Sequence, residues 1–283
     1  MFDPNHDPAP PGAPLVRVIP FGMETTVCYG GGTARGPAAI LDAAPQVELF
    51  DEELWCEPIT RFRTEVAAAP QIEARPEAAL EQLDGLVEAA LAEGAFPLVL
   101  GGEHALTPGA IRPALRRDPS LALLHIDAHA DLRDGYEGEP YSHAAAIRRC
   151  LDAEGVTVTS FGIRNISRTE IAFYEQNRDR VTIHWARDRV EWDLREALAP
   201  LRGRKVWVTI DVDGFDGSVM PATGTPEPGG LFWEDVTGLL RAAADLDWVG
   251  ADIVELAPQP GLHGCDFLCA KLAYKLLAYR FAR

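Results

Sequence analysis

The segment "LLHIDAHADLRD", residues 123–134, couples an apolar run to a cluster of ionisable side chains. Such an apolar run is typical of a strand that is buried on both faces of a sheet. Asp127, His129 and Asp131 follow at alternate positions, and all three carry side chains that bind metal ions. Alternate residues of an extended strand are about 6.6 Å apart. A shared site therefore requires the strand to end near Asp127 and the chain to turn there, whereas His125, inside the run, is interpreted as a structural histidine.

Similar apolar, β-rich runs recur along the chain. Together with the first, they cover residues 15–21, 96–102, 121–127, 156–162, 181–185, 205–211 and 249–255. Between them, helical spacing places Leu80, Leu83, Val87 and Leu91 on one face of a segment and Val236, Leu239, Leu240 and Ala243 on one face of another. This alternation predicts an α/β fold in which helices cover both faces of a parallel sheet.

Polar side chains stand at the ends of several predicted strands, where the chemistry of such folds collects. His104 follows one strand, Asp211 and Asp213 end another, and Glu255 ends a third. A single Asp or His at a strand end is often a turn or cap residue. The recurrence at several strand ends favours a metal site instead.

The candidate ligands comprise two imidazoles and four carboxylates, a set that suits Mn²⁺ or a similar ion better than a closed structural zinc site. Six ligands exceed what one catalytic ion needs, but two ions that share carboxylates would use them all. Paired ions generate hydroxide near neutral pH and orient it for attack. Because four carboxylates balance two divalent ions, a centre with a bridging hydroxide would be negative and would suit a cationic electrophile.

The composition indicates which partners and which cellular setting suit the chain. The chain has 283 residues, 47% of them hydrophobic, and a formal net charge of −17, which disfavours nucleic acid and anionic membrane surfaces as partners. Five cysteines form no disulfide framework of even number and indicate a reducing, cytoplasmic setting. Cys265 and Cys269, four residues apart in a helical pattern, are interpreted as packing residues rather than as zinc ligands.

Residues 1–14, "MFDPNHDPAPPGAP", have neither the basic nor the apolar region of a signal peptide and are expected to form a flexible tail. Residues 15–283 are expected to form a single catalytic domain. No apolar stretch reaches the length of a membrane span.

Several blocks together resemble the signatures of the ureohydrolases, the arginase and agmatinase superfamily. In chain order they are "GGGTARGPAAI" (30–40), "GGEH" (101–104), "DAHAD" (127–131), "IDVDGFD" (210–216), "PATGTPEPGGL" (221–231) and "DIVE" (252–255). The resemblance implies a three-layer arginase-like fold with a parallel sheet of about eight strands. It also implies homotrimers or homohexamers.

The same resemblance implies roles for individual residues. One manganese ion would be held by His104, Asp127, Asp131 and Asp211, and a second by Asp127, His129, Asp211 and Asp213. Glu255 matches the family glutamate that holds the guanidinium group, and His143 matches the histidine proposed for proton transfer. We therefore expect Asp131, His143 and Glu255 to take part in catalysis.

The sequence departs from the family pattern at four positions. Glu103 stands where many members have Asp, Ala105 where many have Ser, Ala144 where many have Gly, and Gly217 where many have Pro. None of these removes a predicted ligand, so an active enzyme is expected.

The loop "LRDGYEGEPYS", residues 132–142, is the predicted determinant of substrate choice. Arginases bind the amino-acid carboxylate here with Asn, Thr and Ser, whereas this loop carries Asp134, Glu137 and Glu139. These acids would attract the far ammonium of agmatine and repel the carboxylate of arginine, unless they are simply exposed to solvent. The segment "IRNIS", residues 163–167, also lacks the acids that arginases use for the α-amino group.

The resulting hypothesis is a manganese agmatinase that produces urea and putrescine in polyamine biosynthesis. Aminopropylagmatine, guanidinobutyrate, arginine and formimino compounds such as formiminoglutamate are alternative substrates. A metal-binding scaffold without turnover is an alternative of a different class. The third alternative, a dinucleotide-binding oxidoreductase, is supported only by the "GGG" near residue 30, which lacks the G-x-G-x-x-G order.

Overall fold

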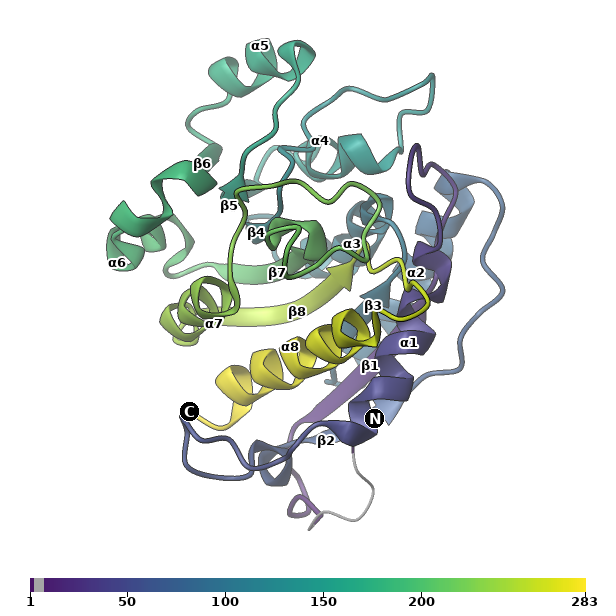
Figure 1. Cartoon of the computed structure of the whole chain (residues 1–283), viewed down its shortest axis with the longest axis vertical. Coiled ribbons are helices and arrows are strands. Elements are labelled where there is room, and N and C mark those ends of the chain that lie inside the picture. Colours follow the sequence, from purple (N-terminus) through teal and green to yellow (C-terminus); the bar gives the residue numbers. More distant parts are fainter. Residues whose placement is uncertain (3–7) are drawn as a thin grey trace.

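Eight parallel strands form one central sheet in the computed structural model, which describes residues 1–2 and 8–283 (Figure 1). The strands are β1 Leu15–Phe21, β2 Arg63–Val66, β3 Phe96–Gly101, β4 Ala122–Ile126, β5 Thr157–Ile163, β6 Val181–Trp185, β7 Lys205–Asp211 and β8 Asp247–Val254. Their spatial order is β2-β1-β3-β8-β7-β4-β5-β6, and every neighbouring pair is parallel.

All seven predicted strands are present, with bounds within two residues of those expected. The central strands are apolar because helices cover both their faces, and every residue of β3 and β4 is buried. The eighth strand, β2, was not predicted. Its sequence "RTEV" is short and mostly exposed at the sheet edge, so it lacks the apolar run that marks the others.

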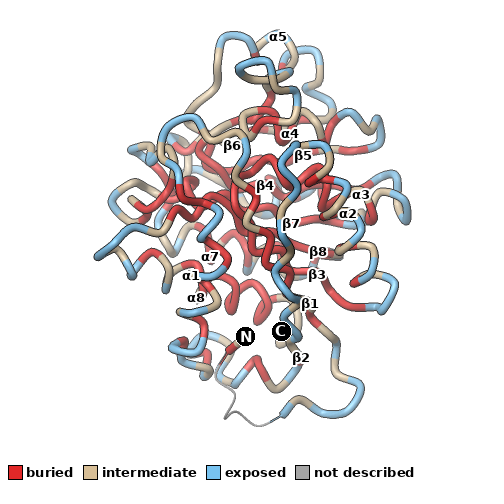
Figure 2. The backbone as a smooth tube through the Cα atoms, turned by 90° about the vertical axis from the view of Figure 1, so that its right-hand side faces the viewer, coloured by how far each residue is buried: buried red, intermediate tan, exposed pale blue. Residues whose placement is uncertain are grey.

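In the described residues, eight α-helices form the outer layers on the two faces of the sheet. They are α1 Gly36–Ala43, α2 Pro76–Ala92, α3 Thr107–Arg117, α4 Ala146–Cys150, α5 Arg168–Gln176, α6 Leu194–Ala197, α7 Trp233–Ala242 and α8 His263–Phe281. One buried cluster packs α1, α6, α7 and α8 against the sheet, and a second packs α2, α3, α4 and α5 against the opposite face (Figures 1 and 2). The expected three-layer α/β architecture is confirmed.

The predicted helix faces and the cysteine interpretation also agree with the structure. In α2, Leu80, Leu83 and Val87 are fully buried, and in α8 the free thiols of Cys265 and Cys269 are buried. None of the helices in the described part of the chain combines the length and the apolar character needed to cross a membrane.

The start of the chain differs in part from the expected flexible tail. Phe2 is buried and packs edge-on against Tyr274 of α8, with the ring centroids 4.8 Å apart. Burial of an aromatic ring anchors this end of the chain to the core. Residues 3–7 of the predicted tail lie outside the described residues.

The strand order brings the predicted site together. The strands β3, β8, β7 and β4 are consecutive neighbours at the centre of the sheet. The segments that follow them carry His104, Glu255, Asp211 and Asp127. Because parallel strands end at the same edge, all four residues emerge on one side of the sheet.

Candidate metal centre and active site

Asp127 and Asp211 organise the turns that end strands β4 and β7. The Oδ1 atom of Asp127 accepts a hydrogen bond from the backbone N–H of His129, at 2.6 Å. In the same way, Oδ1 of Asp211 accepts from the backbone N–H of Asp213, at 2.8 Å. An Asp that bonds the backbone two residues ahead bends the chain into a turn. These turns produce the predicted change of direction, which lets alternate residues share a site.

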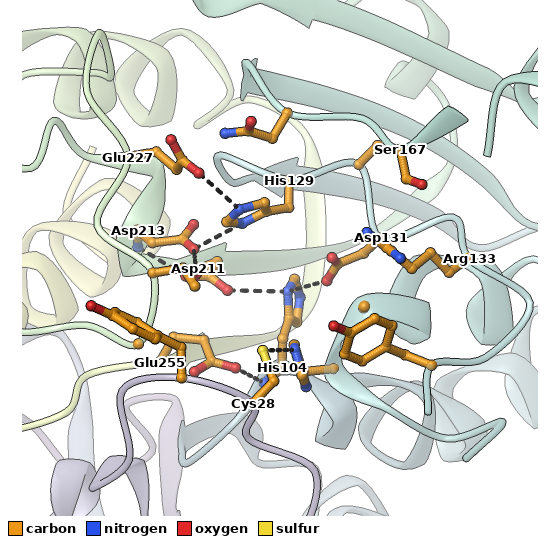
Figure 3. A pocket seen from close by; sticks show the side chains of 18 of the residues that line it. Cys28, His104, His129, Asp131, Arg133, Ser167, Asp211, Asp213, Glu227 and Glu255 are labelled. Carbon is orange, nitrogen blue, oxygen red and sulfur yellow. Dashed lines mark hydrogen bonds and ion pairs between the residues drawn. The ribbon is translucent and has the colours of Figure 1, made fainter. Parts of the chain in front are cut away.

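His104 faces three carboxylates from two different strand ends, and Figure 3 shows two of them, Asp131 and Asp211. Its Nδ1 atom lies 3.0 Å from Oδ2 of Asp127, 3.1 Å from Oδ2 of Asp131 and 3.4 Å from Oδ2 of Asp211. All four side chains are buried or nearly so. This group corresponds to the set expected to hold the first ion.

His129 occupies the corresponding place on the other side of Asp127. Its Nδ1 atom lies 2.9 Å from Oδ2 of Asp213 and 3.6 Å from Oδ1 of Asp127. The two oxygens of Asp127 therefore face different imidazoles, as expected of a carboxylate shared by two ions. The structure thus brings all six predicted ligand residues together.

A buried network fixes the orientation of the His104 ring. Its Nε2 atom lies 3.0 Å from Oγ1 of Thr209, and that hydroxyl donates to Oδ1 of Asp252 at 2.6 Å. The indole N–H of Trp207 donates to the second oxygen of Asp252, at 2.6 Å. Because the Thr209 proton is directed to Asp252, we assign the His104 proton to Nε2, which leaves the lone pair of Nδ1 facing the carboxylates.

The cluster has the properties of a divalent cation site. Nδ1 of His104 is buried and makes no well-oriented hydrogen bond, although it faces three carboxylates. Burial and the negative charge of Asp127 raise the pKa of Asp131 to about 7. Burial, followed by the charges of Asp213 and Asp127, raises the pKa of Asp211 well above its ordinary value. A cation relieves this repulsion, and the nitrogen and oxygen donors suit an ion of hard or borderline character.

His125 lies beside the cluster but already has a partner for each ring nitrogen. Nδ1 is 2.9 Å from Oγ of Ser160, and Nε2 is 2.8 Å from Oδ2 of Asp127. Burial lowers its pKa, despite the opposing effect of Asp127, which favours the neutral ring. The ring therefore orients Asp127 from behind, consistent with the structural interpretation.

Asp131 and Glu255 adopt left-handed backbone conformations, with φ values of 51° and 67°. Such conformations are uncommon in residues other than glycine and concentrate at functional sites. Oε1 of Glu255 accepts the backbone N–H of His104 at 2.6 Å. Glu255 thereby connects the end of β8 with the segment after β3.

Most residues of the cluster, with Glu255, line a cavity of about 320 Å³ beyond the carboxyl ends of the central strands. The wall of the cavity includes Glu255 and His143. It also includes five residues of the metal cluster: His104, His129, Asp131, Asp211 and Asp213. Further along the wall lie Cys28, Arg133, Tyr136, Asn165, Ile166, Ser167 and Glu227. Figure 3 shows side chains from several loops pointing into this space.

The three loop acids expected to select the substrate do not line the cavity. Asp134 is 74% exposed and forms an ion pair with Arg149, with Oδ1 and Nη2 2.6 Å apart. Glu137 is exposed, and Glu139 accepts the backbone N–H of Tyr141. The loop folds back through a bridge between Tyr136 and Glu139, which leaves these acids outside the cavity. Direct selection of the substrate by these acids is therefore not supported.

Sequence reasoning missed several cavity residues. Glu227 lies within the block "PATGTPEPGGL", so its position was marked although its role was not. Arg133 and Tyr136 belong to the predicted specificity loop, and the guanidinium of Arg133 lies 4.8 Å from the Tyr136 ring centroid. Arg164 has a structural role, since it donates to the backbone carbonyls of Asp213 and Glu227 and thereby joins two loops of the site.

Known proteins are similar to this chain in both sequence and fold. The profile of the arginase family matches residues 15–278. The N(1)-aminopropylagmatine ureohydrolase of Synechocystis sp. is 38% identical over 277 residues, which cover 93% of this chain and 88% of that protein. The agmatinase of Bacillus subtilis is 34% identical over 239 residues, which cover 83% of this chain and 81% of that protein.

Among solved structures, the agmatine ureohydrolase of Thermoplasma volcanium superimposes with a TM-score of 0.83 at 29% identity. The match covers 95% of this chain and 90% of that chain. Sequence and architecture thus agree over nearly the whole length. The chain therefore belongs to the arginase family, as a hydrolase of the ureohydrolase type.

Proposed function

We propose that this enzyme is a manganese-dependent agmatinase, which hydrolyses the guanidinium group of agmatine to give urea and putrescine. The observation that carries the proposal is the meeting of two imidazoles, four carboxylates and Glu255 beside one cavity. Homologues named for agmatine and for aminopropylagmatine add support.

The cluster would hold two ions, with Asp127 and Asp211 shared between them. His104 and Asp131 would complete one set of ligands, and His129 and Asp213 the other. When bound, a pair of divalent ions supplies activated water and offsets the negative charge that develops during hydrolysis.

Glu255 is proposed to bind the guanidinium group. One carboxylate oxygen accepts the His104 N–H, which leaves the second for a cation in the cavity. Burial raises the pKa of Glu255 well above its ordinary value, and the charges of Glu103 and Asp213 act in the same direction. A guanidinium ion at this position compensates the buried charge and matches the planar geometry of a carboxylate.

His143 is proposed to protonate the amine as it leaves. The ring lines the cavity, so it is within reach of a bound substrate. An imidazole changes protonation near neutral pH, which suits this transfer.

Glu227 is proposed to bind the far ammonium group of the substrate. Its Oε1 atom lies 4.0 Å from Nε2 of His129, and its side chain is 35% exposed at the cavity wall. Glu227 and Glu255 lie on either side of Asp211 and Asp213 in Figure 3. Two carboxylates at separate points suit a substrate with a cation at each end.

N(1)-aminopropylagmatine is the second candidate substrate, because a relative named for it is 38% identical to this chain. It differs from agmatine only beyond the guanidinium group, so the same metal cluster and Glu255 would serve both. Arg133 at the cavity wall is the residue that would favour a substrate with a carboxylate, such as guanidinobutyrate or arginine.

Urea release tests these alternatives directly. The Mn²⁺-loaded enzyme is assayed with agmatine, N(1)-aminopropylagmatine, 4-guanidinobutyrate and arginine at matched concentrations. We expect the two cationic amines to be hydrolysed with the highest kcat/KM. Higher kcat/KM for either carboxylate substrate would assign the specificity to Arg133, and no urea from any compound by metal-loaded protein would favour a scaffold.

The proposal also covers the assembly of the enzyme and its cellular compartment. We propose a homotrimer or homohexamer in the cytoplasm that contributes to polyamine biosynthesis. The family resemblance supports the assembly, and five free cysteines suit a reducing compartment. Light scattering coupled to size exclusion measures the assembly, and a monomer would contradict this part of the proposal.

A further inference from the structure

Glu103, one of the four residues that depart from the family pattern, is completely buried and accepts four hydrogen bonds. Its Oε1 atom accepts from the backbone N–H and hydroxyl of Thr25, at 2.8 and 2.6 Å. Its Oε2 atom accepts from the backbone N–H and hydroxyl of Thr26, both at 2.8 Å. Two adjacent threonines therefore bind the same carboxylate in the same manner.

Only one of these threonines contacts the catalytic candidate His143. Oγ1 of Thr26 lies 3.1 Å from Nδ1 of His143 and accepts the backbone N–H of His143 at 3.0 Å. A hydroxyl has a single proton, and a carboxylate can only accept. Because Thr26 donates to Glu103, the proton between Thr26 and the imidazole must belong to Nδ1.

The direction of these bonds determines which nitrogen of His143 is basic. With the proton on Nδ1, the neutral ring has its lone pair on Nε2. The Nε2 atom lies 3.6 Å from Sγ of Cys28, which also lines the cavity. The nitrogen that exchanges protons is therefore on the side of the ring where the cavity residue Cys28 lies.

We propose that Thr26 is a positioning residue that, with Glu103, holds His143 in the tautomer whose Nε2 delivers the proton to the leaving amine. This inference rests on the proposed function, because the amine that receives the proton belongs to that reaction. Thr26 itself does not touch the reacting atoms.

The groups around His143 shift its pKa in opposite directions. Burial lowers its pKa, and the charge of Glu103 and a hydrogen bond with the backbone of Thr26 partly offset this effect. Because the Thr26 hydroxyl also accepts from Nδ1 and so favours the protonated ring, its loss should lower the pKa further. The other titratable groups around the ring are Cys28 at Nε2, Tyr136 edge-on, and His104 and His129 across the site.

Three variants of the Mn²⁺-loaded enzyme separate this role from loop stability. Thr26→Val removes the hydroxyl between Glu103 and His143, whereas Thr26→Ser keeps it. Thr25→Val is the matched control, because it removes a hydroxyl bond to the same carboxylate without touching His143. Manganese content and thermal melting temperature are measured for each variant.

With agmatine as substrate, Thr26→Val should lower kcat about tenfold, a fraction of the roughly 10²–10⁴-fold that general acid–base catalysis contributes. KM should change less than about twofold, and the limb of the kcat–pH profile that reports His143 should move to lower pH. Thr26→Ser should recover the wild-type profile, and Thr25→Val should retain it. Equal losses in Thr25→Val and Thr26→Val, or a wild-type profile in Thr26→Val, would overturn the proposal.

A second measurement keeps the inference testable even if no guanidino compound is hydrolysed. Neutron diffraction from deuterated enzyme at alkaline pH, where the ring is neutral, locates the deuteron on His143. Density at Nδ1 is the expected result, and density at Nε2 would contradict the inference. Failure of the urea assay with density at Nδ1 would reject the proposed reaction but not the orientation of the ring.

Discussion

The backbone N–H of His104 donates to Oε1 of Glu255 over 2.6 Å. Glu255, which is proposed to bind the substrate, is thus hydrogen-bonded to His104, which is proposed to bind metal. The two residues follow the neighbouring strands β3 and β8, although 151 residues separate them in the sequence. This bond uses one carboxylate oxygen and directs the carboxylate toward the cluster.

Glu255→Gln should lower kcat/KM for agmatine by about 10²- to 10³-fold, because an amide lacks the charge that binds guanidinium but can still accept the His104 N–H. Urea release measures the loss. Manganese content should stay at the wild-type level, since that hydrogen bond is retained. Wild-type kcat/KM in this variant would remove Glu255 from substrate binding.

Glu227→Gln should raise KM for agmatine about tenfold with little change in kcat, since it removes one carboxylate from the proposed ammonium site. Glu137→Gln is the matched control, because Glu137 is exposed in the specificity loop and does not line the cavity. Steady-state kinetics of the two variants distinguish the positions. A KM effect in Glu137→Gln but not in Glu227→Gln would restore the original interpretation of the loop.

Alkylation of Cys28 should inhibit the enzyme, because this exposed thiol lies at the cavity wall beside His143. Iodoacetamide should label Cys28 before the buried Cys150, and saturating agmatine should slow the loss of activity. Mass spectrometry identifies the labelled residue. Cys28→Ala should resist inactivation, so inhibition at the wild-type rate in this variant would place the sensitive group elsewhere.

Acid should weaken the attachment of α8 to the loop that carries Glu53. Burial tends to raise the pKa of Glu53, but hydrogen bonds from Tyr279, Arg241 and Lys275 outweigh it and lower the pKa to about 2, from 4.5. A folded-state pKa below the unfolded value stabilises the protein above the unfolded pKa. This stabilisation should be lost as the pH falls from about 4.5 to about 2.

Denaturant unfolding of Glu53→Gln and wild type across this pH range measures the contribution. The difference in their free energies of unfolding should be largest above about pH 4.5 and should shrink toward pH 2. A difference that stays constant with pH would show that ionisation of Glu53 contributes nothing.

The central sheet could be predicted because burial on both faces leaves a clear sequence signal. β4 and β7 are apolar throughout most of their length, and the polar residues of the site stand at the end of β7 and directly after β4. The edge strand β2 could not be recognised, because four mostly exposed residues carry neither an apolar run nor a clear alternation. Phe2 was assigned to a tail because its contact with Tyr274 is made by residues at opposite ends of the chain.

The metal cluster was predictable for a related reason, since its ligands recur at alternate positions just after strands. The substrate end of the cavity was not. Whether Asp134 or Arg133 faces the cavity depends on the turn of one loop, which composition does not specify. The contact of Thr26 with His143 spans 117 residues and has no local sequence signal.

Asp127→Asn tests the central claim most directly, because Asp127 faces both imidazoles of the cluster. The measurement is urea release from agmatine with added Mn²⁺, by wild type and by this variant. We predict that wild type releases urea only with the metal and that the variant loses turnover. Urea release by Asp127→Asn at the wild-type rate, or by wild type after complete removal of metal, would contradict the account.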